Sequence, residues 1–340
     1  MRQKTYRGYF KKMITAKRIF QRLSILILIL ALTVAFLPAC SGNGLYTVGN
    51  GELKVVCTSF PPFDLARQVG GEKVTLTVLQ DNGADLHNYS PTAKTLLALS
   101  EADVFIAIGG ESDKKWVDDA IESAQNPDLK VIYLTDGIEL KHAELERTDH
   151  GEGHDHSAEH GESGDEHVWL SLKNAISITE KICAAFTEKD AESSAYYRAN
   201  ATAFTEKLSA LDREYEKAVA ESDKKTVVVA DRFPFIYLTD DYGLSYYAAF
   251  SGCSTEVNSD FATQIKLINA VKEHDLHAII VTEGGGKDLA DNICSETGCK
   301  KVALNSMQSV TRAEIESGAT YIGIMTKNLA SLKAALSQNP

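Results

Sequence analysis

The chain has 340 residues, of which 44% are hydrophobic and 24% are charged. This balance is typical of globular proteins and excludes a disordered chain or a coiled coil. The formal net charge is −12, but residues 1–39 hold eight Lys or Arg and no acid, so the remainder carries −20. An anionic body of this kind excludes nucleic acid as an electrostatic partner, repels anionic lipid head groups and suits cations.

Residues 1–39 have the pattern of a lipoprotein signal peptide. Basic residues come first, and an uncharged apolar run follows over residues 23–39, which is short for a membrane span. The run ends in Leu-Pro-Ala before Cys40 and resembles a bacterial lipobox. We therefore predict cleavage before Cys40, lipidation of Cys40 and a flexible tether over residues 40–51. The folded part then lies outside the cytoplasm, anchored to the bacterial cell membrane by lipid. An uncleaved anchor is the alternative. Met1 and Met13 both stay open as the translation start, and the expected location of the folded part is the same for either.

The cysteines of the chain are Cys40, Cys57, Cys183, Cys253, Cys294 and Cys299. Once Cys40 is lipidated, an odd number remains, and these cannot all pair within one chain. Cys294 and Cys299 are five residues apart and could bridge, because thiols outside the cytoplasm can oxidise. Either of them could instead bridge to Cys253. Cys57 and Cys183 are expected to be buried free thiols.

From residue 52 the hydrophobic pattern alternates between the periods of strands and helices. Strands are predicted over residues 54–58, 74–79, 104–108 and 131–134. Helices are predicted over residues 63–69, 90–101 and 116–124. Ser90 is the expected N-cap of the second helix, with Pro91 as its first residue. Such βα units predict a mainly parallel sheet covered on both faces, here an N-terminal lobe over residues 52–170.

The polar segment 140–166 interrupts this pattern, because it holds almost no apolar side chains and is expected to be a loop. Helices are predicted over residues 172–187 and 190–221. Apolar residues of the second recur at three- or four-residue steps, and about thirty residues at 1.5 Å each give a rod of roughly 45 Å. Residues 171–222 are therefore expected to connect two lobes and to resist bending.

A C-terminal lobe is predicted over residues 223–337, where the βα alternation resumes. Its expected strands are residues 226–230, 245–250, 278–282 and 301–304. Its expected helices are residues 235–241, 260–274, 289–296 and 321–336. The sequence thus predicts an α/β fold of two similar lobes with mainly parallel sheets, joined by one long rigid helix. Ligands of open α/β sheets bind beyond the carboxyl ends of the strands, so we expect the site in the cleft between the lobes.

Five of the nine histidines of the chain lie in or next to the polar segment, among several carboxylates. They are His142, His150, His154, His156 and His160. Histidine-rich tracts with carboxylates are metal-binding compositions, because imidazole suits Zn, Cu and Ni. The glycines of the segment favour transient capture over a rigid site, so we predict an auxiliary metal loop. A solvated acidic loop with incidental histidines is the alternative.

Two further histidines lie where loops meet the expected folded body. His87 follows the second predicted strand, and His167 stands where the polar segment ends, directly before Val-Trp-Leu. The segments 87–92 and 165–170 resemble the two metal-histidine motifs of bacterial zinc/manganese ABC-transporter solute-binding lipoproteins. The histidine-rich loop between them, the lipobox, the two lobes and the single long helix are similar as well. The resemblance covers residues 50–337 and implies that His87 and His167 bind the metal.

The family commonly completes its site with a third His or Glu after the first strand of the C-terminal lobe, and with a carboxylate late in that lobe. This sequence departs from both patterns. The third position falls at Arg232, which cannot bind a cation, so the neighbouring Asp231 is the candidate ligand; a structural Asp-Arg pair is the alternative. The late carboxylate falls at Asn305, whose amide oxygen is a weaker zinc ligand.

Two acidic residues extend the list of hypothetical ligands. Glu283 follows the predicted strand 278–282, at the edge where the cleft is expected, and precedes three glycines. This glycine-rich turn lacks the Lys-Ser/Thr of a phosphate-binding P-loop. Glu256 is a reserve candidate.

The resemblance implies a lipid-anchored monomeric receptor that captures Zn²⁺ and delivers it to an ABC permease and its ATPase. Two imidazoles with one or two oxygen ligands suit four-coordinate Zn²⁺, whereas Mn²⁺, the alternative cargo, favours more oxygen ligands. A secreted zinc hydrolase is disfavoured because His-Glu-x-x-His and Gly-x-Ser-x-Gly motifs are absent, so we predict no enzyme. A metal-stabilised surface adhesin and a zinc buffer without a transporter stay open.

Overall fold

The computed structural model describes residues 45–80, 89–114, 116–142, 145–147, 164–252, 259–285 and 287–337. The predicted signal peptide, Cys40, His87, Cys253 and Glu256 lie outside these ranges, as do four of the five tract histidines. Within them, no helix has the length and apolar character needed to cross a membrane.

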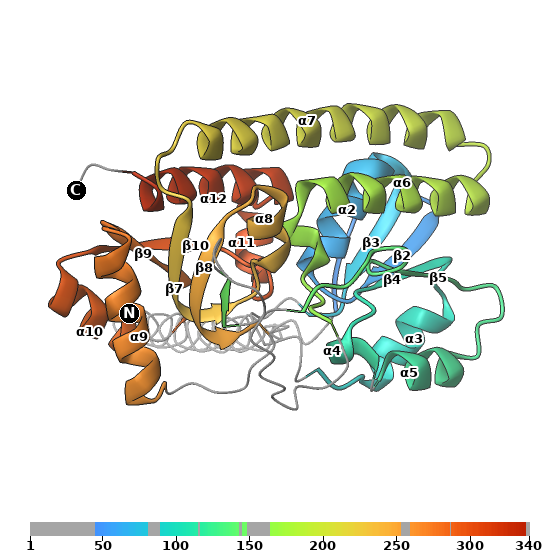
Figure 1. The fold of residues 1–340 in the computed structure, drawn as a ribbon. Coiled ribbons are helices and arrows are strands. Elements are labelled where there is room, and N and C mark those ends of the chain that lie inside the picture. Colours follow the sequence, from blue (N-terminus) through green and yellow to red (C-terminus); the bar gives the residue numbers. More distant parts are fainter. Residues whose placement is uncertain are drawn as a thin grey trace, which may run out of the picture. The chain divides into compact units, whose positions relative to one another are not determined.

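The first lobe is built on a five-stranded sheet with the order β1-β3-β2-β4-β5 (Figure 1). Its strands are β1 (Tyr46–Val48), β2 (Leu53–Cys57), β3 (Val74–Val78), β4 (Val104–Ala107) and β5 (Lys130–Tyr133). The helices are α2 (Phe60–Gly70), α3 (Ala93–Ser100), α4 (Glu111–Lys114) and α5 (Val117–Ala124), with a 3-10 turn η1 (Gly71–Lys73). All strand pairs are parallel except β1 with β3.

Alternating side chains of the first sheet enter two different cores, as the two-residue period of a strand requires. Val55 and Cys57 of β2 pack in the core formed with α2 and α6. Val56 between them packs in the core formed with α3 and α5. Helices therefore cover both faces, which confirms the prediction made from the apolar strands.

Two local predictions in this lobe are wrong. The tether expected over residues 40–51 includes Tyr46–Val48, which form β1 and pair with β3. The helix expected from Ser90 begins later as α3, because Thr92 caps it: its side chain accepts from the backbone N–H of Thr95, and the Thr95 side chain accepts from the N–H of Thr92. This reciprocal capping box satisfies two backbone donors at once.

The second lobe contains a five-stranded sheet with the order β10-β9-β7-β8-β6. Its strands are β6 (Glu146–Arg147), β7 (Thr226–Phe233), β8 (Ser245–Ser251), β9 (Ala278–Thr282) and β10 (Lys300–Leu304). Its helices are α8 (Ile236–Asp241), α9 (Phe261–Glu273), α10 (Lys287–Thr297), α11 (Arg312–Glu316) and α12 (Tyr321–Ala335). β6 pairs antiparallel with β8, so part of the segment expected to be a loop adds an edge strand to this sheet.

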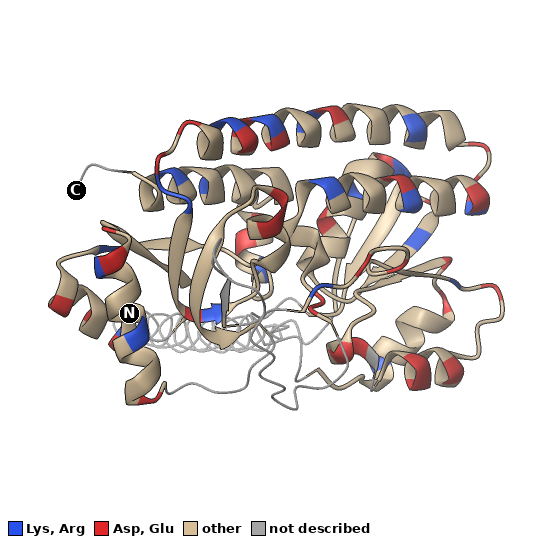
Figure 2. Cartoon of the chain, viewed as in Figure 1, with Lys and Arg blue, Asp and Glu red and all other residues tan. Residues whose placement is uncertain are grey.

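The longest helix of the described residues, α7 (Ser194–Ala220), has 27 residues and is about 40 Å long. It follows α6 (Leu172–Lys189) and lies against α6, α2 and α12 (Figure 1). One continuous hydrophobic core includes residues of both sheets and of all these helices. The structure thus confirms two lobes with mainly parallel sheets joined by one long helix. Figure 2 shows both signs of charge along α6 and α7, and acidic residues along α5.

Two charged side chains of α2 also form hydrogen bonds with the backbone at the start of α12. Asp64 of α2, which is fully buried, accepts from the backbone N–H of Tyr321 at 2.6 Å. It pairs with Arg67 at 2.5 Å, and Arg67 donates to the carbonyl oxygen of Ala319 at 2.9 Å. The start of α12 is therefore tied to the first lobe.

Candidate metal centre

His167 lies at a turn that the chain makes before α6. Val168–Leu170 form the 3-10 turn η3, and all three side chains are fully buried. Trp169 Nε1 donates to the carbonyl oxygen of Ser306 at 2.9 Å, which ties this turn to the second lobe. The apolar run that follows His167 thus anchors its backbone, and the imidazole itself is fully buried.

Asp165 sets the orientation of the His167 ring. Its Oδ1 accepts from the backbone N–H of His167 at 2.9 Å and lies 2.8 Å from ring Nδ1. Asp165 is itself held by Tyr237, whose hydroxyl donates to the Asp165 carbonyl oxygen at 2.6 Å. A carboxylate on Nδ1 keeps the proton there and leaves the Nε2 lone pair for another partner, as in metal-binding histidines.

The charges around His167 favour a cation. Burial alone lowers the pKa of the imidazole, but the carboxylates of Asp165, Glu166 and Glu283 outweigh it and raise the pKa above its ordinary value. The same negative field would stabilise a metal ion at Nε2. Because only the neutral ring binds metal, a bound cation would have to displace a proton here.

The group that faces His167 Nε2 is the side-chain amide of Gln308, in the loop after β10. The assignment of amide oxygen and nitrogen depends on the hydrogen-bond network, and a half-turn of the amide presents its oxygen to the same point. Gln308 can therefore share a cation with His167. Sequence reasoning missed Gln308, because only Asn305 was considered in this loop; the available signal was a second amide beyond the carboxyl end of the same strand.

The side chain of Asn305 is engaged in its own turn. Asn305 Oδ1 accepts from the backbone N–H of Met307 at 2.8 Å, and Met307 has a φ of +63°. The backbone of Asn305 exchanges two hydrogen bonds with the Asn328 side chain, each 2.8 Å long. This turn brings the chain round so that Gln308 rather than Asn305 contacts His167.

Glu283 lies at the carboxyl end of β9 and is held by Ser306. The carboxylate accepts from the backbone N–H of Ser306 at 2.7 Å and from its hydroxyl at 2.5 Å. Burial raises the pKa of Glu283, and the hydrogen bonds from Ser306 offset only part of this. Ser306 also contacts the Gln308 side chain through its hydroxyl at 3.5 Å. It thereby links Glu283 with the amide that faces His167.

Asp231 is bound within the second sheet. Its Oδ2 accepts from Thr282 Oγ1 at 2.6 Å, and its Oδ1 accepts from the backbone N–H of Arg232 at 2.8 Å. The register of β7 and β8 shifts between Val229 and Arg232, and a bulge of this kind redirects side chains at a strand end. A Cβ at Gly285 would lie 1.4 Å from Asp231 Oδ2, so the glycine-rich turn accommodates this carboxylate.

The structure thus brings together His167 and Gln308 directly, with Glu283 next to them through Ser306. His142 is exposed. Among the described residues, no three His, Cys, Asp or Glu side chains lie close enough to hold a metal ion. His87, the second predicted ligand, lies outside this part of the chain.

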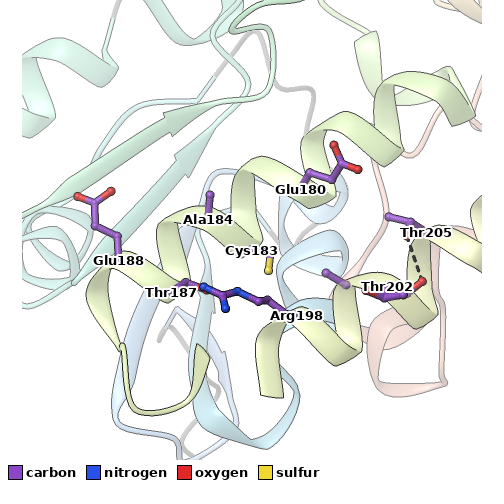
Figure 3. Close-up of a pocket in the computed structure, with 9 residues that line it drawn as sticks. Glu180, Cys183, Ala184, Thr187, Glu188, Arg198, Thr202 and Thr205 are labelled. Carbon is purple, nitrogen blue, oxygen red and sulfur yellow. Dashed lines mark hydrogen bonds between the residues drawn. The ribbon is translucent and has the colours of Figure 1, made fainter. Parts of the chain in front are cut away.

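A groove of about 660 Å³ lies elsewhere, between α6 and α7 (Figure 3). Its lining includes Cys183, Glu180, Glu188 and Arg198, and none of the candidate ligands takes part. The groove is therefore separate from the site at His167.

The two α/β lobes, the connecting helix and the buried histidine define a class of two-lobed proteins with mainly parallel sheets. The model of the family "Zinc-uptake complex component A periplasmic" (ZnuA) matches residues 55–335. The chain belongs to this family.

Similar proteins agree with this membership. The zinc-binding lipoprotein AdcA of Streptococcus pneumoniae is 31% identical over 92% of this chain, and the chain spans 61% of the AdcA length. The high-affinity zinc uptake system protein ZnuA of Bacillus subtilis is 30% identical over 84% of this chain and 88% of its own length. The Zn(II)-bound ZnuA-like domain of S. pneumoniae AdcA matches 85% of this chain and 100% of that domain, with a TM-score of 0.68 and 29% identity.

Proposed function

We propose that this protein captures Zn²⁺ outside the cytoplasm and delivers it to an ABC permease with its ATPase. The observation that carries the proposal is the buried His167, whose Nδ1 is held by Asp165 and whose Nε2 faces the Gln308 amide. Membership of a family of zinc-uptake components supports the same cargo. The role is that of a receptor, without a catalytic step.

The proposed ligands are His167 Nε2 and the Gln308 amide oxygen, with His87, which follows β3 in the sequence, as a further ligand. Glu283 acts as the nearby carboxylate, and Asp231 and Asn305 are kept as weaker hypotheses. Imidazole nitrogen with few oxygen donors suits Zn²⁺ in a four-coordinate site. A neutral amide in place of a carboxylate weakens binding and so favours release to the permease. Mn²⁺ remains the alternative cargo; it differs from Zn²⁺ in favouring more oxygen ligands.

The location and the remaining partners belong to the same proposal. Curated relatives are called lipoproteins, which supports an extracytoplasmic place. We propose cleavage of residues 1–39, lipidation of Cys40 and delivery by a monomer. The assignment of residues 52–170, 171–222 and 223–337 to a first lobe, connecting helices and a second lobe stays a proposal as well, except that β1 extends the first sheet and β6 belongs to the second.

The test is calorimetric titration of the protein from Ser41 onward with Zn²⁺ and, separately, with Mn²⁺. His167→Ala is expected to weaken tight zinc binding by at least about 100-fold, since loss of a ligand exceeds the loss of its supporting groups. His87→Ala is expected to do the same. His142→Ala, which changes an exposed histidine, is the matched control and should leave the tight site unchanged. Tight zinc binding that survives both ligand substitutions would refute the proposed site.

We also propose that His142, His150, His154, His156 and His160 form an auxiliary collector of zinc. Deletion of residues 148–163, which removes four of them, is expected to lower the total zinc bound per chain. The affinity of the tight site should stay the same, because His167 is anchored by η3. Metal content after equilibrium dialysis measures both quantities. An unchanged stoichiometry would rule out the collector.

A further inference from the structure

Two thiols of the second lobe lie against each other. Cys294 is in the last turn of α10, Cys299 lies between α10 and β10, and their sulfur atoms are 2.8 Å apart. Both are free thiols, as are the other two cysteines of the described residues, the buried Cys57 and Cys183. Cys294 is partly exposed and Cys299 is buried.

The backbone around these thiols holds them in this contact. Gly298 has a φ of +75°, a conformation that glycine adopts without steric cost. Its N–H donates to the carbonyl oxygen of Cys294 at 2.8 Å, which closes the end of α10. Directly after Cys299, Lys300 pairs with Ala278 of β9. One thiol is thus fixed by a helix end and the other by the start of a sheet strand.

We propose that Cys294 and Cys299 are an oxidation site that forms an intramolecular disulfide and cross-links α10 to β10. The partner is a disulfide oxidant, such as an oxidised low-molecular-weight thiol. That the pair meets oxidising conditions in the cell rests on the proposed function, which places the protein outside the cytoplasm. The reactivity of the two thiols does not depend on it. Neither thiol belongs to the proposed zinc site.

The reaction consists of two thiol–disulfide exchanges. The Cys294 thiolate, the more accessible of the two, attacks one sulfur of the oxidant, breaks its S–S bond and releases one thiolate. The Cys299 thiolate then attacks Cys294 Sγ in the mixed disulfide, forms the protein disulfide and expels the second thiolate. The protons of the two cysteines end on the two released thiols. The protein loses two electrons, and the oxidant gains them.

The rate of the first step depends on pH. Burial, together with the neighbouring Cys299 thiol, raises the pKa of Cys294 to about 12. The thiolate fraction is therefore small at neutral pH and grows about tenfold per pH unit in the alkaline range. The pair is expected to oxidise slowly at neutral pH and faster as the pH rises.

The test uses the full chain in mild detergent, with a chelator present and oxidised glutathione as the oxidant. After alkylation, tryptic cleavage releases residues 288–300, which contain both cysteines. This peptide is expected to lose the mass of two hydrogen atoms and to take up no alkyl group. Cys57 and Cys183 should be alkylated once the protein is unfolded, since they have stayed reduced.

Three comparisons decide the proposal. In a glutathione redox buffer, the oxidised-to-reduced ratio is expected to be at least about 10-fold higher in folded than in urea-unfolded protein, because the fold holds the thiols together. Cys253→Ser should leave the ratio unchanged, and Cys299→Ser should stop Cys294 at the glutathione adduct. Equal ratios in folded and unfolded protein, or a cross-link to Cys253, would overturn the assignment. Because the chelator removes zinc, failure of the zinc site would not alter these results.

Discussion

The identity of a single amide decides the chemistry at His167. Asn305 and Gln308 are both amides after β10, but the turn at Met307 uses Asn305 Oδ1 as a backbone acceptor and leaves Gln308 to contact the imidazole. The sequence contains both residues and offers no means to choose between them. The choice depends on one residue with a positive φ, which residue type alone does not reveal.

Substitution of Gln308 tests its place among the ligands. Gln308→Glu puts an anionic oxygen where the neutral amide lies, and is expected to tighten zinc binding by about 10-fold, because a carboxylate is the better zinc ligand. Gln308→Ala should weaken binding. Competition with a zinc-binding dye at neutral pH measures both. If the Glu and Ala variants bind alike, Gln308 does not contact the metal.

The buried carboxyl group of Asp113 should make the free energy of unfolding depend on pH. Its carboxylate is buried and accepts from the backbone N–H groups of Ile108 and Gly109 at 2.5 and 3.0 Å. Burial raises its pKa from 3.8 to about 6, and Glu166 adds to this. An acid with a raised pKa in the folded state costs stability when ionised. Stability is therefore expected to fall as the pH rises from about 4 to 6, by up to about 3 kcal/mol.

Asp113→Asn should remove this pH dependence and leave the variant at least as stable as the parent at neutral pH. The measurement is the free energy of unfolding in urea across this pH range. Asp119→Asn, which changes an exposed acid in α5, is the control and should retain the slope. A slope that persists in the Asp113 variant would assign the effect to other carboxylates.

At the scale of elements, the sequence predicted the long apolar strands and the amphipathic helices, because their periodicity extends over several turns or residues. It missed the edge strands β1 and β6, which have three and two residues. A period of two cannot be detected in so short a run, and an edge strand is defined by its partner in the sheet. Neither Arg232 nor the bulge before it could be interpreted without the register of β7 and β8.

Ser306 holds the loop after β10 in place through hydrogen bonds to the end of β9 and to η3. Its hydroxyl and N–H bind Glu283 at the end of β9, and its carbonyl oxygen accepts from Trp169 of η3. Ser306→Ala removes the hydroxyl and is expected to reduce zinc affinity by about 10-fold, as for other residues that orient ligands. Ser309→Ala, in the same loop, is the control. Equal affinities in the two variants would show that Ser306 does not position the site.

At the scale of the whole molecule, the hydrophobic core continues from the first sheet through α6 and α7 to α12. Such continuity couples the lobes energetically. Unfolding in urea is therefore expected to be a single transition, seen at the same midpoint by circular dichroism and by tryptophan fluorescence. The chain has two tryptophans, so Trp116→Phe leaves Trp169 as a reporter between the lobes. Two separate midpoints would show lobes that unfold independently.

The contact between Asp64 and Tyr321 has a consequence for folding during synthesis of the chain. The two residues are 257 positions apart, which a ribosome covers in roughly 10–50 s at 5–20 residues per second. During this interval the nascent first lobe holds a carboxylate at a site whose backbone donor has not been synthesised. Until α12 emerges, Asp64 has Arg67 of its own helix as a partner but lacks the backbone donor of Tyr321, so this part of the first lobe is completed only late in synthesis.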